Sequence, residues 1–295
     1  MNLTKLEAFI LVIEKKSFSE AAIALKSSQP ATSLKIKSLE EELGLDLLDR
    51  GSSGIQPTAA GMLVYQASKE MVQRWRRLED DLRAFEDTLT GTLTIGASTI
   101  PGTYLVPSWV KKFRSLYPNV AVTIEISDSK EALRKLQNQL VDVCITGLPS
   151  ESKALSYKQV SSDALVLIAP YHHPLGLSNE PTFEQIKQFD FVIREEGSGT
   201  RKVMEDYLSI HSHSPSLSDL NPVVSIGSTE AVIAAVEAGL GISFVSKLAA
   251  VPAAKAKRIQ IIEKFEPFQR NFYFTTLSDA KDRPIIKEFS EIIGS

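Results

Sequence analysis

The sequence is poor in cysteine and histidine, with one cysteine and four histidines among its 295 residues. The single thiol, Cys144, cannot form a disulfide within the chain, so a disulfide framework and a CxxC-type metal site are both excluded. The N-terminal segment MNLTKLEAFILVIEKKS is not a continuous apolar run, because Lys5, Glu7 and Glu14 interrupt it. It predicts neither a signal peptide nor a membrane-spanning helix, and we expect a cytoplasmic protein without a membrane partner.

The sequence also lacks an excess of positive charge. Its 33 Lys and Arg residues face 36 Asp and Glu residues, which gives a formal net charge of -3. This balance argues against general coating of nucleic acid or of an anionic membrane, so contact with phosphate requires a local patch. Such a patch lies between Ala21 and Leu39, where three lysines occur and acidic residues are absent.

Length and composition indicate a globular protein with more than one domain. Hydrophobic residues make up 43% of the chain and charged residues 23%, which is ordinary for a soluble globular protein. At about 100 to 200 residues per domain, the chain accommodates two or three domains.

The first 50 residues predict three helices. Residues 6–13 repeat apolar side chains at spacings of three and four, as in an amphipathic helix. A second, short helix begins near Phe18, and a third begins at the N-cap Ser28, tolerates Pro30 in its first turn and ends at Gly44. The tight link between the second and third helices predicts a helix-turn-helix.

A turn-rich segment and a long helix follow. Residues 51–61, GSSGIQPTAAG, predict a small two-stranded wing, after which Thr58 caps the next helix. From about residue 58 to 88 an apolar stripe predicts one long helix. A single helix cannot bury this stripe, so we expect it to pair with another copy of the chain. The stripe consists of Val64, Ala67, Met71, Trp75, Leu78, Leu82 and Phe85.

Beyond Gly91, short apolar strands alternate with helical segments. This alternation predicts α/β layers with mainly parallel sheets, and its length accommodates two lobes with a cleft between them. The predicted helices lie at about 103–116, 130–140, 200–210, 229–238 and 284–293, between and after strands such as TLTIGA, VAVTIEIS, VDVCITG, ALVLIAP, FDFVIRE, VVSIGS, ISFVS and NFYFTTL.

Polar and basic side chains gather at the start of the third helix. In a helix-turn-helix this end enters the major groove, where donors and acceptors meet base edges and lysines bind phosphate. A charge run alone more often marks a solvated helix face. The candidate DNA-binding residues here are Gln29, Pro30, Thr32, Ser33, Lys35 and Lys37.

The identities of the residues favour DNA recognition over a merely solvated helix face. The segment SFSEAAIALKSSQPATSLKIKSLEEELGLDLLDR, followed by GIQPTAAG, resembles the winged helix-turn-helix of LysR-type transcriptional regulators. The resemblance implies that Gln29, Pro30 and Ser33 contact DNA and that Arg50 binds near its backbone. Leu34 departs from the arginine that the family commonly has after this serine. The wing, usually basic, carries Ser53 and Gln56 here, which leaves the operator sequence and the strength of wing contact open.

The resemblance extends along the whole chain and implies an architecture. It implies a two-lobed effector domain similar to the type 2 periplasmic binding proteins, with two crossover strands joining the lobes. It also implies dimers that assemble into tetramers, a partly palindromic DNA operator, a small-molecule effector and contact with RNA polymerase. The expected parts are a DNA-binding domain at 1–61, a linker and dimerisation helix at 62–90, and an effector domain at 91–295, with lobe I at about 91–163 and 268–295 and lobe II at about 164–267.

Hydroxyl-bearing turns mark the expected effector cleft. In such folds ligands bind at the carboxyl ends of strands, where helix N-termini present free N–H groups. Each turn alone is explained as a helix cap, but their recurrence at one topological position favours a common ligand. Arg194 and Arg201 are weaker candidates, because arginines at such positions more often lie on the surface. The effector-binding candidates are Ser98, Thr99, Ser198, Gly199, Thr200, Ser228 and Thr229, with Ser127, Ser129, Thr146 and Gly147 as further cleft walls.

Hydroxyls and helix amides hold a small oxyanion or carboxylate without needing a buried cation. The stretches REEGSGTR and GSTEAVIAAVEAGLGISF resemble the branch of LysR-type regulators associated with sulfur and other small-anion metabolism. A sulfate-like anion is therefore the first expectation, and a small carboxylate or an aromatic acid is the alternative.

An enzyme and a solute receptor are the rival classes. His172 and His173 lie in a turn, His211 and His213 in a polar loop, and Cys144 on an apolar strand. We therefore expect no catalytic residue, no metal and no cofactor. A solute-binding receptor would use the same cleft, but the absent export signal and the DNA reader oppose it. Target genes and the direction of regulation stay open.

Overall fold

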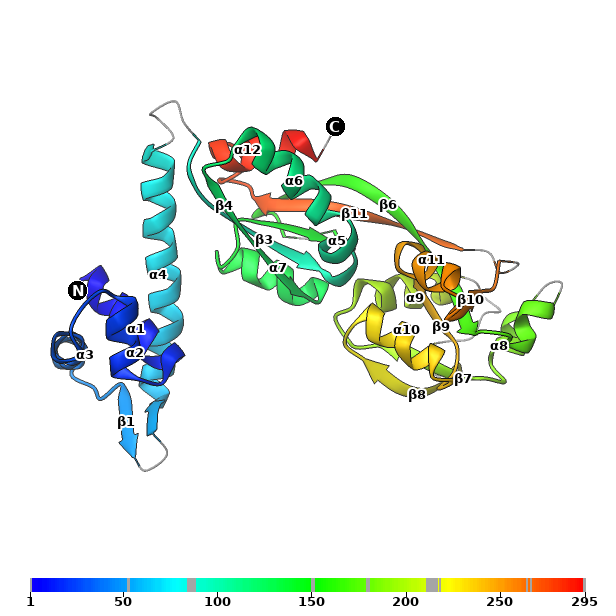
Figure 1. The fold of residues 1–295 in the computed structure, drawn as a ribbon, viewed down its shortest axis with the longest axis horizontal. Helices are drawn as coiled ribbons and strands as arrows, with labels where there is room; N and C mark the ends of the chain where they lie inside the picture. Colours follow the sequence, from blue (N-terminus) through cyan, green and yellow to red (C-terminus); the bar gives the residue numbers. More distant parts are fainter. Residues whose placement is uncertain are drawn as a thin grey trace. The chain divides into compact units, whose positions relative to one another are not determined.

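The computed structural model describes residues 2–51, 54–83, 89–149, 152–178, 181–210, 217, 219–263, 265 and 267–293. The chain divides into two compact units, residues 1–86 and 87–295. The first is coloured blue to cyan in Figure 1, and the second continues from cyan to red. Within the described residues, no helix is both long enough and apolar enough to cross a bilayer.

The first unit is a winged helix-turn-helix followed by a long helix. Hydroxyl caps begin three of its helices, since Ser17, Ser28 and Thr58 accept hydrogen bonds from Glu20, Ala31 and Gly61 N–H groups, and the Asn2 side chain caps the first helix. This architecture confirms the predicted fold class. Its elements are α1 (Leu3–Lys15), α2 (Phe18–Ala24), α3 (Gln29–Leu43), β1 (Leu48–Gly51), β2 (Gly54–Pro57) and α4 (Ala59–Arg83).

Hydrogen bonds and a close backbone contact hold the turn between α3 and the wing against the start of α4. The Glu40 carboxylate accepts hydrogen bonds from the Leu47 and Leu48 N–H groups at 2.9 and 3.2 Å. The Thr58 N–H donates to the Leu47 carbonyl at 3.0 Å. A Cβ atom at Gly61 would lie 2.0 Å from the same carbonyl oxygen, so α4 approaches the turn this closely only because residue 61 is glycine.

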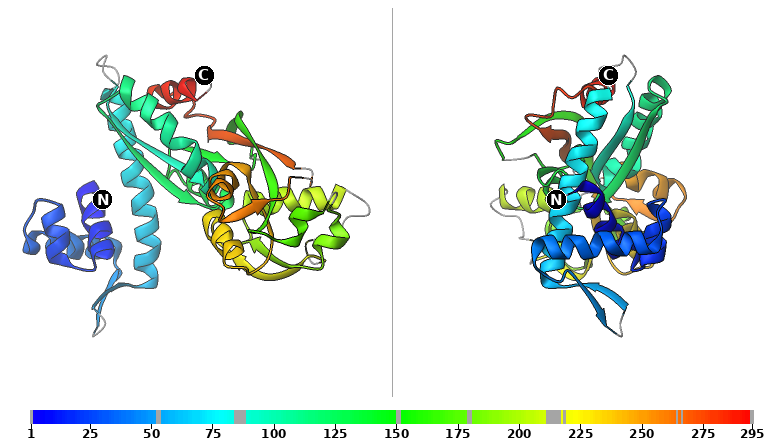
Figure 2. Two further views of the ribbon diagram at one scale, coloured as in Figure 1. Left: turned by 45° about the vertical axis from the view of Figure 1, so that its right-hand side comes forward. Right: turned by 90° about the vertical axis from the view of Figure 1, so that its left-hand side faces the viewer.

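The second unit consists of two lobes joined by two long strands, β6 (Leu155–Pro170) and β11 (Phe268–Leu277). Both strands run from one lobe into the other (Figures 1 and 2). Lobe I contains β3 (Gly91–Ser98), α5 (Thr99–Tyr104), α6 (Val106–Leu116), β4 (Val120–Ser127), α7 (Ser129–Gln137), β5 (Val143–Thr146) and α12 (Pro284–Ile292). Lobe II contains η2 (Pro174–Leu177), α8 (Phe183–Ile186), β7 (Asp190–Arg194), α9 (Gly199–Ile210), β8 (Asn221–Ile226), α10 (Thr229–Glu237), β9 (Ser243–Ser246), α11 (Lys247–Lys255) and β10 (Ile259–Ile261).

Sheet pairing corrects the expectation of mainly parallel sheets. β3 pairs with β4 and β5 in parallel, and β7 pairs with β8 in parallel. The crossover strands instead pair antiparallel with each other, and β5, β9 and β10 join them antiparallel. Two chain segments that cross between lobes in opposite directions necessarily form an antiparallel pair, which the local strand–helix rhythm does not reveal.

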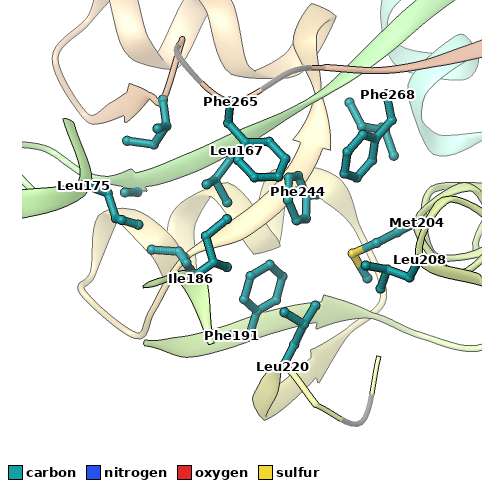
Figure 3. Close-up of a cluster of buried hydrophobic side chains, with 14 residues drawn as sticks. Leu167, Leu175, Ile186, Phe191, Met204, Leu208, Leu220, Phe244, Phe265 and Phe268 are labelled. Carbon is teal, nitrogen blue, oxygen red and sulfur yellow. The ribbon is translucent and has the colours of Figure 1, made fainter. Parts of the chain in front are cut away.

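Side chains of β11 belong to the cores of both lobes and to the space between them. Phe268 belongs to the lobe II core and Phe274 to the lobe I core. Figure 3 shows Phe268 pointing toward Phe244 and Phe265 in lobe II, and its ring centroid lies 4.7 Å from that of Phe244. Because alternate residues of a strand share a face, Arg270 follows Phe268 on the same face and lies between the cores.

Candidate functional site

The first candidate site is the outer face of α3. Gln29, Pro30 and Lys37 are exposed, and Ser33 and Lys35 are half-buried. Lys37 lies 3.8 Å from the exposed Glu41 carboxylate, a pair that solvent screens. Five of the six candidate residues on α3 therefore have solvent-accessible side chains.

Thr32 is the sixth, and its assignment as a DNA contact is wrong. Its side chain is fully buried with Ile36 and Leu39, and its hydroxyl donates to the Ser28 carbonyl at 3.1 Å. The spacing of Thr32, Ile36 and Leu39 at i, i+4 and i+7 is the signal that places this residue on the inner face.

Two acidic residues at the end of α3, Glu40 and Glu42, bind groups within this unit. Glu40 accepts the two N–H groups described above, and Glu42 forms an ion pair with Lys5 of α1. The hydrogen bond from Lys5 lowers the pKa of the Glu42 carboxyl. Among the wing residues, Gln56 is exposed on β2, whereas the Arg50 side chain and Ser53 lie outside the described part of the chain.

The apolar stripe of α4 is exposed within this unit. Met71, Trp75, Leu78 and Leu82 are each between 44% and 57% exposed. An adjacent face of the helix packs on α1, where Val72 is buried. The stripe therefore keeps apolar area available for another surface, while Phe85 lies outside the described residues.

The second candidate site is a cavity where the lobes meet. Its free volume is about 10 Å³, the room of roughly one water molecule, so a larger ligand requires the lobes to move apart. Seven of the predicted effector-binding residues line it. The wall consists of Ser98, Thr99, Ile100, Asp128, Ser129, Gly147, Arg194, Ser198, Gly199, Thr200, Arg270 and Phe272.

Two buried arginines belong to this wall, and one of them is Arg194, which the sequence analysis ranked below the hydroxyl residues as more typical of the surface. Arg194, at the end of β7, is 4% exposed and donates to the Glu195 carboxylate through Nε and Nη2, both at 2.7 Å. Its Nη1 donates to the Thr229 hydroxyl at 2.7 Å and to the Thr99 hydroxyl at 3.4 Å. The second bond joins lobe II to lobe I.

Arg270 is the functional candidate that sequence reasoning missed. Its register partner on β6 is Asp163, and the two side chains form a buried ion pair with Nη2 and Nε at 2.6 and 3.0 Å from Oδ2. Its Nη1 donates to the Thr200 hydroxyl at 2.9 Å. Burial lowers the pKa of the guanidinium, although Asp163 opposes this shift, and an arginine stays protonated in proteins. The signal in the sequence was an arginine within the alternating apolar residues of FQRNFYF.

Ser129 contributes a buried hydroxyl to the cavity wall. The residue is 1% exposed, and its Oγ has no hydrogen-bond partner among the described residues. It begins α7, and Gly199 begins α9 directly opposite, since a Cβ atom at Gly199 would lie 3.0 Å from this Oγ. The first turns of two helices and an unpaired hydroxyl therefore share one wall, which is a suitable environment for an anionic oxygen.

Four predicted residues lie outside the cavity wall. Thr229 contacts it indirectly through Arg194. The Ser127 hydroxyl donates to the Asp128 carbonyl at 3.3 Å, and the Thr146 hydroxyl donates to the Leu148 carbonyl at 2.9 Å. The Ser228 hydroxyl caps α10 by accepting from the Ala231 N–H at 3.1 Å.

The other candidates have structural surroundings. Arg201 pairs with Glu205 at 2.8 Å on the surface of α9. Cys144 is buried, its Sγ lies 3.0 Å from the Ala132 carbonyl, and burial raises the pKa of the thiol. Among the described residues, three or more His, Cys, Asp or Glu side chains nowhere form a group that could hold a metal ion. His211 and His213 lie outside them.

Both candidate sites fall in regions that match known families. Residues 3–62 match the family described as "Bacterial regulatory helix-turn-helix protein, lysR family", and residues 86–295 match "LysR substrate binding domain". The chain belongs to the LysR family. The predicted family and fold class are thereby confirmed, and the protein is a ligand-responsive, DNA-binding LysR-type transcriptional regulator.

Relatives and solved structures support this membership along the chain. The uncharacterized HTH-type transcriptional regulator MJ0300 of Methanocaldococcus jannaschii is 33% identical over 288 residues, or 97% of this chain and 96% of that protein. The full-length LysR-type regulator CbnR in complex with its target DNA has the same fold, with a TM-score of 0.73, 19% identity and 99% of each chain covered. The CcmR regulatory domain of Synechocystis in complex with 2-PG gives a TM-score of 0.60 and 27% identity, covering 69% of this chain and 95% of that domain.

Proposed function

We propose that this LysR-type regulator senses a small anion in the cavity between its lobes. The observation that carries the proposal is the buried Ser129 hydroxyl, which has no partner among the described residues and lines the cavity beside the first turn of α9. An unpaired buried hydroxyl is unfavourable unless a ligand supplies the missing hydrogen bond.

The arginines of the cavity wall are already neutralised by carboxylates. Arg194 with Glu195 and Arg270 with Asp163 form neutral pairs. Asp128 adds a carboxylate to the wall. Helix N-termini and hydroxyls are therefore the groups left to stabilise ligand charge.

The candidate effectors are a tetrahedral oxyanion of sulfur and a small carboxylate. Both present acceptor oxygens that the Ser129, Ser198 and Thr200 hydroxyls can bind, and both require the lobes to move apart, because the free volume is about 10 Å³. The complex of the CcmR regulatory domain with 2-PG supports an organic anion as the second candidate. An aromatic acid would require the lobes to move further apart.

We propose that α3 enters the major groove of a partly palindromic operator and that the α4 stripes of two copies pair in a dimer, with tetramers formed from dimers. Gln29, Pro30, Ser33, Lys35, Lys37 and Arg50 are the proposed DNA contacts. The parts act as a DNA-binding domain (1–61), a linker (62–90) and an effector domain (91–295). The regulator works in the cytoplasm and acts on transcription through RNA polymerase.

Effector binding alters DNA binding by stabilising one arrangement of the lobes. Arg194 of lobe II already donates to Thr99 of lobe I across the cavity, so an anion bound there strengthens a contact between lobes. A ligand shifts such an equilibrium only by binding one arrangement more tightly than the other.

A thermal-shift screen of the full-length protein tests the proposed effector class. The panel contains sulfate, sulfite, thiosulfate, phosphate, 2-PG and small carboxylates at constant ionic strength. We expect one class of anion to raise the Tm saturably, because a ligand that binds the folded state stabilises it. A folded protein whose Tm responds to none of these anions would contradict the anion cavity.

A further inference from the structure

Leu34 is an exposed leucine on the outer face of α3. Its side chain is 66% exposed, whereas Thr32, Ile36 and Leu39 of the same helix are fully buried. At about 3.6 residues per turn, Leu34 lies nearly opposite these three residues on the helix circumference. It is one turn beyond Pro30, and the two form an apolar strip at the start of the helix.

The surroundings of this strip are polar and basic. Gln29 and Ser33 lie beside it, and the exposed Lys37 follows Leu34 one turn later. Acidic residues are absent between Ala21 and Leu39. An apolar protein partner would leave these donors and charges without partners, whereas DNA offers hydrogen-bonding base edges and phosphates to each of them.

The major groove carries one apolar group that a leucine can contact. Thymine presents its C5-methyl group there, and the other base atoms exposed in the groove are mainly hydrogen-bond donors and acceptors. Side chains on a helix lean toward its N-terminus, so the isobutyl group of Leu34 covers the first turn of α3, the part that lies deepest in the groove.

We infer that Leu34 is a specificity-determining residue that contacts the C5-methyl group of a thymine in each half-site. The contact favours thymine over the other bases because it removes the leucine side chain and the thymine methyl group from water, without a hydrogen bond. This inference rests on the proposed position of α3 in the major groove.

Uracil substitution tests the contact directly, because uracil differs from thymine only by the missing methyl group. A duplex is first selected from random DNA with the full-length protein. Each thymine is then replaced singly by deoxyuridine, and the Kd is measured for wild type and for Leu34→Ala at constant salt. The difference between the uracil penalty of wild type and that of Leu34→Ala measures the contact itself, because an effect of uracil on DNA shape is the same for both proteins.

We expect one thymine per half-site at which uracil weakens wild-type binding about fourfold, the value for one lost methyl contact. At that position, Leu34→Ala binds the thymine and uracil duplexes equally. Ile23→Ala is the matched control, because Ile23 is 77% exposed on α2 and should keep the full sensitivity to uracil.

Two results would overturn the inference. In the first, every uracil penalty is the same in wild type and Leu34→Ala, or Ile23→Ala abolishes it equally. If Gln29→Ala and Ser33→Ala still weaken binding in that case, only the role of Leu34 fails. In the second, Gln29→Ala, Ser33→Ala and Leu34→Ala all leave the Kd unchanged, and the position of α3 in the groove fails with it.

Discussion

At the residue scale, the cavity combines groups that the sequence predicts with groups that it conceals. Hydroxyl residues after strands, such as Ser98, Ser198 and Thr200, are recognisable because turns and caps favour them locally. Arg270 is concealed because its role depends on Asp163, a residue 107 positions earlier in the chain. Only the pairing of β6 with β11 brings the two together.

Ser129→Ala should separate ligand binding from stability. The Oγ has no hydrogen-bond partner among the described residues, so its removal should leave the Tm of the ligand-free protein unchanged or slightly raised. Affinity for the effector anion should fall about ten- to a hundredfold, the value of one lost hydrogen bond to a charged group. Calorimetric titration with the anion that gives the largest thermal shift measures this.

Thr275→Val is the matched control for that substitution. The Thr275 hydroxyl is also buried without a partner among the described residues, but Thr275 is not part of the cavity wall. This variant should bind the anion as wild type does. Equal losses of affinity in both variants would refute a direct role for Ser129.

Thr229→Val should weaken effector binding through Arg194. The variant keeps the side-chain shape but removes the oxygen that accepts from Arg194 Nη1 at 2.7 Å. Nη1 would keep only the longer bond to Thr99 at 3.4 Å, at a cost of up to about 1 to 3 kcal/mol of unfolding free energy, and the guanidinium should lose its fixed position. Thr229→Ser, which keeps the oxygen, should restore the affinity. DNA affinity without effector should stay unchanged in both, and a matching loss of DNA binding would indicate unfolding instead.

At the element scale, helix ends were the most predictable feature and long-range pairing the least. Ser28 and Gly44 mark the ends of α3 in the sequence, and the structure has an N-cap and a left-handed C-cap at these residues. The helix expected at 103–116 is instead α5 and α6, which meet at Leu105. α11 escaped prediction because Pro252 lies inside it, where the local rule disfavours a helix.

Gly61→Ala should destabilise the N-terminal unit. The new Cβ atom would lie 2.0 Å from the Leu47 carbonyl oxygen, so α4 must move away from the turn before the wing. Overpacking of this kind costs about 1 to 3 kcal/mol, and DNA affinity should fall with it. Urea unfolding followed by Trp75 fluorescence reports on this unit when the second tryptophan, Trp109, is replaced by phenylalanine in all variants. Gly227→Ala, where the Cβ meets open space, should leave that transition unaltered; an equal stability for Gly61→Ala would contradict the close approach.

Replacing both Leu78 and Leu82 with Glu should shift the protein toward monomers. These residues are 47% and 57% exposed on α4, and burying charge in a paired apolar stripe is unfavourable. Sedimentation velocity of the full-length protein measures the change. Met62→Glu and Leu82→Glu are compared as single variants that add the same charge on different faces of α4, and Met62→Glu should preserve the oligomer. An unchanged oligomer in the double variant would rule out pairing through this stripe.

At the scale of the whole molecule, the chain joins a DNA-binding unit to a ligand-binding unit without an overall positive charge. With a net charge of -3, its affinity for DNA depends on local groups on α3 rather than on the average field. The family resemblance predicted this organisation. The sequence did not predict neutral arginine–carboxylate pairs in the cavity, because side chains that meet between lobes come from distant segments.

The most direct test measures DNA affinity while the cavity is filled. The full-length protein is titrated onto its selected duplex with increasing effector anion, and chloride keeps the ionic strength constant because salt alone weakens DNA binding. We predict that the anion changes the Kd or the footprint of wild type, and that Ser129→Ala requires about ten- to a hundredfold more anion for the same change. An identical Kd and footprint with and without saturating anion would contradict an anion-controlled regulator.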